Sequence, residues 1–214
     1  GPWQGLTELG LHHEQQHQEL ILTDVKHLLS LHPLAPAYHH KPSSGPALAS
    51  APAWIAHEGG IAAIGAPKGF CFDNEQPRHE VLLRPYLLAS RLVTNGEYAA
   101  FIEAGGYGDP ALWLSEGWDW VQANTIAHPI YWRRQDDAGS EFTLAGLQRL
   151  DPNSPVAHVS YFEADAFARW TVANYLDDPS LANGFYGYTS LNLVDSGADN
   201  VTSFNRPALN SSTS

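Results

Sequence analysis

The chain has 214 residues, with 11 Lys and Arg against 23 Asp and Glu, and a formal net charge of −12 at pH 7. This negative charge opposes binding to nucleic acid phosphates and to anionic membrane surfaces. A single cysteine excludes an intramolecular disulfide, and no apolar run has the length of a membrane span or a secretory leader. We therefore expect a cytoplasmic protein without a nucleic acid or membrane partner, long enough for one domain plus part of another.

The first predicted element is an amphipathic helix over residues 6–31. Its apolar residues recur at helical spacing, and His13 and His17 fall on the same face as this stripe. Two imidazoles four residues apart project from successive turns, the spacing with which one helix offers two nitrogen ligands to a metal ion. Glu19 or Glu14 could accept a hydrogen bond that orients a ligating imidazole. The alternative is a histidine pair satisfied by hydrogen bonds in a core or interface.

This helix cannot bury its apolar stripe by itself. We expect that the functional protein contains a segment upstream of Gly1, and that the isolated chain aggregates or associates with another chain. His12 falls on a different face from the histidine pair, and we expect it to be solvated.

A region rich in Pro, Ala, Ser and His follows over residues 32–52 and predicts a linker. The histidines within it, His39 and His40, are expected to be solvated. Two strands are predicted next, at residues 59–65 and 80–89. Pro85 within the second strand favours a sheet edge or a bulge.

Two helices are predicted in the remainder of the chain. Thr94 with Glu97, and Ser160 with Glu163, each have the spacing of a capping box. The helices are expected at residues 95–104 and 160–170. Between them the sequence predicts a loop-rich region that is ordered by the packing of large aromatic side chains. These are Tyr107, Trp113, Trp118, Trp120, Tyr131 and Trp132.

Other candidate residues have structural explanations. The carboxylate and amide oxygens at residues 73–75 could serve a calcium ion, but the preference of Asp and Asn for turns favours a turn. Cys71 lies in an apolar run and is expected to be a packing residue. His79 and His158 are expected to make scaffold hydrogen bonds.

Several segments together resemble one family, the ergothioneine-type sulfoxide synthases. These are nonheme iron enzymes that join a DinB-like helical bundle to a formylglycine-generating-enzyme-like domain. The resemblance covers residues 6–170, and its order and spacing are far more specific than any single motif. The matching segments are residues 13–20 (HEQQHQEL), 72–75 (FDNE), 77–79 (PRH), 93–98 (VTNGEY), 105–107 (GGY) and 155–164 (PVAHVSYFEA).

The resemblance implies an α+β fold in which the C-terminal piece of a DinB-like bundle precedes a formylglycine-generating-enzyme-like (C-type-lectin-like) domain that is incomplete here. Residues 171–214 depart from the family pattern, and we interpret them as a reading-frame disruption or fragment end, or as a diverged ending. Tyr186 and Tyr188 in this tail are expected to be ordinary loop aromatics. The implied domains are residues 1–32 (last bundle helix), 33–53 (Pro-rich linker), 54–170 (sulfatase-modifying-factor-like domain) and 171–214 (divergent or truncated tail).

The resemblance also implies a chemistry. Such enzymes use a three-histidine iron(II) site and O2 to join hercynine to cysteine or gamma-glutamylcysteine through a carbon–sulfur bond. In that pattern His13 and His17 would be two iron ligands, and Gln16 would help to hold the substrate. The third histidine comes from an upstream helix in this family, and no residue before Leu6 is a histidine. The chain would therefore hold part of the metal site.

Two other functions remain open. The first is a catalytically silent scaffold or binding module, because a fold does not fix a function. The second is a zinc- or nickel-dependent thiol-transferase or hydrolase built on the DinB-like helix, although the long second domain argues against it. Two histidines do not specify the metal.

Overall fold

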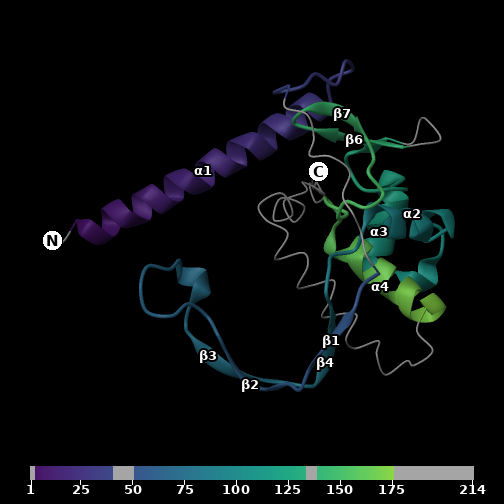
Figure 1. The fold of residues 1–214 in the computed structure, drawn as a ribbon. Helices are drawn as coiled ribbons and strands as arrows, with labels where there is room; N and C mark the ends of the chain where they lie inside the picture. Colours follow the sequence, from purple (N-terminus) through teal and green to yellow (C-terminus); the bar gives the residue numbers. More distant parts are fainter. Residues whose placement is uncertain (1–2, 41–50, 134–138, 176–214) are drawn as a thin grey trace, which may run out of the picture.

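The computed structural model describes residues 3–40, 51–133 and 139–175. Its mixture of helices and antiparallel strands agrees with the predicted α+β class (Figure 1). The elements are α1 (Gln4–Ser30), β1 (Trp54–His57), β2 (Gly60–Ile64), η1 (Asp73–Glu75), β3 (His79–Leu83), β4 (Tyr86–Ala89), α2 (Asn95–Glu103), η2 (Pro110–Leu112), α3 (Ser115–Asn124), β5 (Trp132–Arg133), β6 (Ser140–Thr143), β7 (Gly146–Arg149) and α4 (Tyr161–Tyr175).

An aromatic core forms where α2 packs against α4. The rings of Tyr98 and Phe167 stack with their centroids 5.3 Å apart, and Phe101 meets Trp170 edge-on at 5.6 Å. Such pairs add stability beyond the apolar area that they bury. The predicted packing role of the aromatic residues is confirmed for those that are buried, which are Tyr107, Trp113, Tyr131 and Trp132.

Both predicted capping boxes are present. The Glu97 amide donates to Thr94 Oγ1, and the Thr94 amide donates to the Glu97 carboxylate at 2.8 Å. At the start of α4 the Ser160 amide donates to Glu163 at 2.6 Å, and the Glu163 amide donates to Ser160 Oγ. The predicted helix at 95–104 is therefore confirmed, and the one at 160–170 continues to Tyr175.

The prediction of a loop-rich region between these helices is wrong in part. Residues 115–124 form α3, and β5, β6 and β7 form an antiparallel sheet. The segment of α3 has weak periodicity and a central glycine, so its pattern did not indicate a helix. Gly117 is buried against the side chain of Phe162 in α4, and this tertiary contact stabilises α3.

The two predicted strands lie in a long hairpin that bends at its middle, together with β1, which the sequence did not predict. β1 pairs with β4, and beyond the bend β2 pairs with β3. Pro85 divides the predicted strand at 80–89, as its sequence position indicated. Gly59 lies opposite, where an added β-carbon would be 2.5 Å from the Leu83 carbonyl oxygen. The hairpin curves away from α2, α3 and α4, and its tip comes close to α1 (Figure 1).

The helix α1 extends away from the core, and its C-terminal end lies at the sheet of β6 and β7 (Figure 1). Its side chains from Trp3 to Leu22 are exposed apart from the half-buried His12. This exposure agrees with the expectation that the helix cannot bury its apolar stripe by itself, since the described residues do not form a bundle around α1. None of the described helices is long and apolar enough to cross a membrane.

The described start of the predicted linker is attached to the domain. The amides of Tyr38 and His39 both donate to the Leu144 carbonyl, which lies in the turn between β6 and β7. His39 is half-buried rather than fully solvated, whereas His40 is exposed as expected. Backbone hydrogen bonds therefore fix the position of the chain where it leaves α1.

Candidate metal site and its surroundings

The helix α1 brings the imidazoles of His13 and His17 together. Their ring centroids are 4.4 Å apart and the rings are nearly perpendicular, at 82°. Both side chains are exposed. Four residues advance a helix by slightly more than one turn, so both rings project from the same side of α1.

This pair fits two positions of a metal site. Neutral imidazole nitrogens are suitable donors for iron(II) and for other first-row metals. Among residues 3–40, 51–133 and 139–175 no group of three or more His, Cys, Asp or Glu side chains is arranged to hold a metal. Among the described residues, the pair is therefore not part of a larger group of metal-binding side chains.

The two other predicted site residues lie on the same exposed stretch of α1. Gln16 immediately precedes His17 and is exposed. Glu19 is also exposed, and its backbone carbonyl accepts a hydrogen bond from Thr23 Oγ1 at 3.3 Å. Between the described side chains, no hydrogen bond connects the Glu19 carboxylate to either imidazole, so its orienting role remains a prediction.

The expectation that His12 is solvated is wrong. Its ring stacks on Phe70, with the centroids 4.1 Å apart and the planes at 21°. Phe70 belongs to the hairpin tip, residues 66–78, which lies between β2 and β3. The contact joins segments far apart in the sequence, so helical periodicity alone could not reveal it.

The hairpin tip is held by its own hydrogen bonds. The Ala66 amide donates to the Glu75 carbonyl at 2.9 Å, and Arg78 donates to the Gly65 carbonyl at 2.7 Å. Residues 73–75 form the short helix η1, which confirms a structural turn there. Cys71 is half-buried, and its Sγ accepts a hydrogen bond from Gln76.

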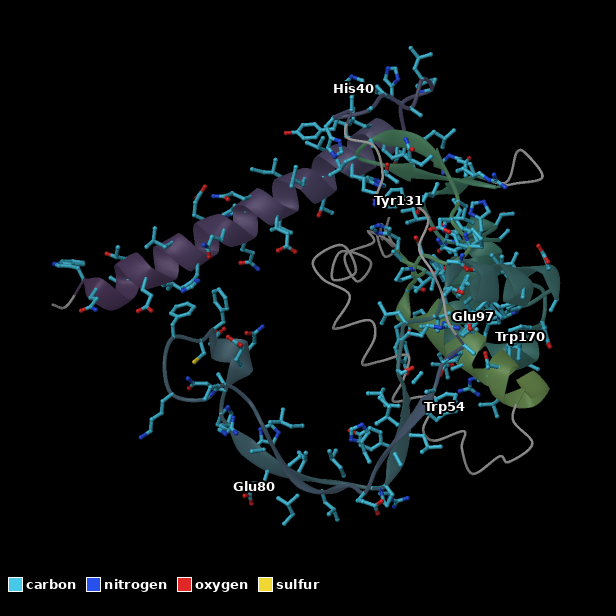
Figure 2. All side chains as sticks on the ribbon, in the orientation of Figure 1. His40, Trp54, Glu80, Glu97, Tyr131 and Trp170 are labelled. Carbon is cyan, nitrogen blue, oxygen red and sulfur yellow. The ribbon has the colours of Figure 1, made fainter. Side chains whose placement is uncertain are left out.

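A second contact holds the C-terminal end of α1 against the domain. The Lys26 ammonium donates to His158 Nε2 at 2.6 Å and lies 4.7 Å from the centre of the Tyr131 ring. Arg133 donates to the Ser30 carbonyl at 3.1 Å. In Figure 2, Tyr131 lies between the end of α1 and the core helices. Sequence reasoning did not identify Lys26, and it predicted Tyr131 as a packing aromatic without its contact to α1, because nothing in the local pattern relates the two residues.

The scaffold roles predicted for two histidines are confirmed. His158 is buried, with its ring against Tyr131 and its Nε2 accepting from Lys26. His79 Nδ1 lies 2.9 Å from the Pro77 carbonyl oxygen, to which it donates.

Glu141 is a half-buried carboxylate whose pKa is affected by Lys26. Burial raises the pKa of Glu141, the charge of Lys26 opposes that increase, and the charge of Asp151 adds to it.

Comparison with known proteins identifies the domain. Residues 40–186 match the sulfatase-modifying factor enzyme 1-like domain. The chain belongs to this family. The match begins within the predicted linker and continues past Trp170. Residues 176–186 of this match, and Tyr186 and Tyr188 of the predicted tail, lie outside the described residues.

The relatives include two enzyme types within this family. The hercynine oxygenase of Mycolicibacterium thermoresistibile is 32% identical over 162 residues, which are 75% of this chain and 35% of that protein. The hercynine oxygenase of Mycolicibacterium smegmatis is 30% identical over 168 residues, 77% of this chain and 38% of that protein. The formylglycine-generating enzyme of Streptomyces coelicolor is 33% identical over 123 residues. The match covers 48% of this chain and 36% of that protein. The chain thus spans little more than a third of each relative.

Proposed function

We propose that this chain is part of a nonheme iron(II)- and O2-dependent enzyme that acts on hercynine, with His13 and His17 as two of the iron ligands. The observation that carries the proposal is the pair of imidazoles with centroids 4.4 Å apart on one side of α1. The similarity to proteins named hercynine oxygenase supports the substrate.

The reaction that we propose is sulfoxide synthesis. A carbon–sulfur bond forms between the imidazole carbon of hercynine and the sulfur of cysteine or gamma-glutamylcysteine, and that sulfur becomes a sulfoxide. The carbon–hydrogen and sulfur–hydrogen bonds break. O2 accepts the four electrons, so that one oxygen atom enters the product and the other leaves as water.

Within this proposal, each residue of the chain has a defined task. His13 and His17 offer neutral nitrogen donors, which requires both rings to be deprotonated at the donor atom. Gln16 offers an amide beside the pair, which can hold the hercynine imidazole by hydrogen bonds. Bound iron(II) would supply open coordination positions for the thiol and O2.

The remaining parts of the site are also proposals. We infer that a further ligand comes from a helix upstream of Gly1, and that this helix belongs to a DinB-like bundle that covers the exposed apolar side of α1. Burial of such a surface stabilises the assembled protein in proportion to its area. A cytoplasmic location fits the acidic charge balance and the single cysteine.

The proposal is tested with a protein that includes the upstream segment. Hercynine, a thiol donor, iron(II) and O2 are supplied, and the sulfoxide is sought by mass spectrometry. We expect product with cysteine or with gamma-glutamylcysteine, and none under anaerobic conditions or from His17→Ala. If the folded, iron-loaded protein forms no sulfoxide with either donor, the proposed reaction is wrong. If the folded protein does not take up iron at all, a silent binding module is the better interpretation.

A further inference from the structure

We propose that Phe70 is a positioning residue, which holds the metal-ligand segment of α1 against the hairpin tip. The proposal rests on the proposed function, because it assigns the His13 and His17 pair to a metal. In addition, we infer that a contact with the hairpin sets the direction of this pair. This contact lies far from the C-terminal end of α1, which is attached to the core.

The contact lies directly beside the ligand pair. Phe70 stacks on His12, the residue before His13, with the ring centroids 4.1 Å apart. His12 is the half-buried residue within the otherwise exposed stretch from Trp3 to Leu22. On a helix, Gln16 is one turn from His12 and also neighbours His13 and His17, so the tip meets the face next to the donors.

The hairpin tip is built to hold Phe70 in place. Phe72 packs edge-on against Phe70, with centroids 5.3 Å apart. The Phe72 amide donates to the Glu75 carboxylate at 2.7 Å, and the Gln76 amide donates to the Asp73 carbonyl. A loop with internal hydrogen bonds of this kind loses little further conformational freedom when its ring meets the helix.

The stack supports α1 at a second point. The attachment at Lys26 is 14 residues beyond His12, which is about 21 Å along a helix. His13 and His17 lie between the two points. A helix attached at one end only can tilt about that end, and the imidazoles would move with it. Metal sites require donors held within about 0.5 Å of their working positions, so a second support has a direct consequence for binding.

The test compares variants of the protein that includes the upstream segment. Phe70→Ala removes the stack, and Phe70→Tyr retains an aromatic ring of the same shape. Leu82→Ala is the matched control, because Leu82 is an exposed apolar residue on β3 of the same hairpin. Two quantities are measured: the dissociation constant for iron(II), and amide hydrogen exchange of residues 9–22 in the metal-free protein.

We expect Phe70→Ala to weaken iron(II) binding about tenfold, as the loss of a residue that supports metal ligands does. Exchange over residues 9–22 should rise, while the melting temperature of the domain stays the same. Phe70→Tyr should retain the iron(II) affinity and the slow exchange of residues 9–22 that the unmodified protein shows. Leu82→Ala should also match the unmodified protein in both. The KM for hercynine should rise with Phe70→Ala more than kcat falls. If Phe70→Ala does not fold, His12→Ala removes the stack from the other side.

The outcomes separate this inference from the proposed function. If His17→Ala abolishes iron binding while Phe70→Ala and His12→Ala leave both affinity and exchange unchanged, the positioning role is overturned and the proposed function stands. If His17→Ala leaves iron binding intact, both are overturned. A loss of affinity in Phe70→Ala that Phe70→Tyr does not restore also contradicts a positioning role for the ring.

Discussion

Lys26 of α1 and His158, in the segment before α4, are joined by a hydrogen bond of 2.6 Å between Nζ and Nε2. The two residues are 132 positions apart in the sequence. The ammonium also lies over the Tyr131 ring, which adds a cation–π contact. If Lys26 were replaced, Nε2 of His158 would lose this hydrogen bond, although the ring would stay buried.

We therefore expect Lys26→Met to loosen the C-terminal end of α1. A hydrogen bond from a charged donor contributes about 1.5–3 kcal/mol, and a buried acceptor without a partner is costly. Amide exchange over residues 23–30 should accelerate, whereas Lys68→Met, a change of an exposed lysine in the hairpin tip, should not alter it. Equal protection in the Lys26 variant and the unmodified protein would show that this hydrogen bond does not hold α1.

A second prediction concerns the packing of α3 against α4. A β-carbon at Gly117 would lie 2.6 Å from Cβ of Phe162 and 2.7 Å from its Cγ. Gly117→Ala should therefore destabilise the protein by about 1–3 kcal/mol through overpacking. Gly10→Ala is the control, because nothing lies within 4 Å of that position on α1. It should leave stability equal or raise it by up to about 1 kcal/mol. Urea unfolding measures both, and equal effects would contradict the packing.

The buried phenol of Tyr107 predicts a loss of stability at alkaline pH. Burial raises its pKa well above 10.0, and the neighbouring Tyr98 and Glu163 raise it further. The folded state keeps the phenol proton at a pH where the unfolded state has lost it. The contribution is therefore complete below about pH 10 and is lost as the pH rises through the folded-state pKa.

Tyr107→Phe tests this effect. It removes the hydrogen bond of 2.7 Å to Glu163 and should lower stability at pH 7 by about 1–3 kcal/mol. Above pH 10, the stability of the variant should fall less steeply than that of the unmodified protein. The free energy of unfolding of both proteins is measured from pH 8 to 11. Parallel curves for the variant and the unmodified protein would show that the pKa of Tyr107 does not change on unfolding.

The lowered pKa of Glu97 predicts that the protein loses stability at acidic pH. Burial raises its pKa, but the hydrogen bonds and charge of Arg91 and the amide of Thr94 outweigh burial, so the pKa is lowered from 4.5. The stabilisation is present above about pH 4.5 and is lost as the pH falls through the folded-state pKa. Glu97→Gln should lower stability at pH 7 by about 1 kcal/mol, a modest value because the side chain is 39% exposed. The variant should also lose less stability between pH 5 and 3 in thermal melts, whereas an unchanged acid profile would contradict the assignment.

The local signals in the sequence predicted several elements of the fold. Thr94 with Glu97, and Ser160 with Glu163, marked two helix starts because a capping box involves residues only three positions apart. Pro85 marked the division of a strand because proline cannot donate to a sheet ladder. In each case, the residues that determine the structure lie close together in the chain.

Contacts between distant segments were not predictable in this way. The helix α3 depends on the close approach of Gly117 and Phe162, and the burial of His12 depends on Phe70 of the hairpin tip. The Lys26 attachment likewise depends on His158. For the candidate site, the sequence predicted that His13 and His17 share one side of a helix, since this follows from helical geometry alone.

The most direct test of the metal assignment is iron(II) binding under anaerobic conditions, measured with a protein that includes the upstream segment. His13→Ala and His17→Ala are compared with Gln15→Ala, an exposed residue on the opposite side of α1. We predict one tightly bound iron in the unmodified protein and in Gln15→Ala, and a loss of at least about 100-fold in affinity when either histidine is replaced. Unchanged iron affinity in both histidine variants would contradict the assignment.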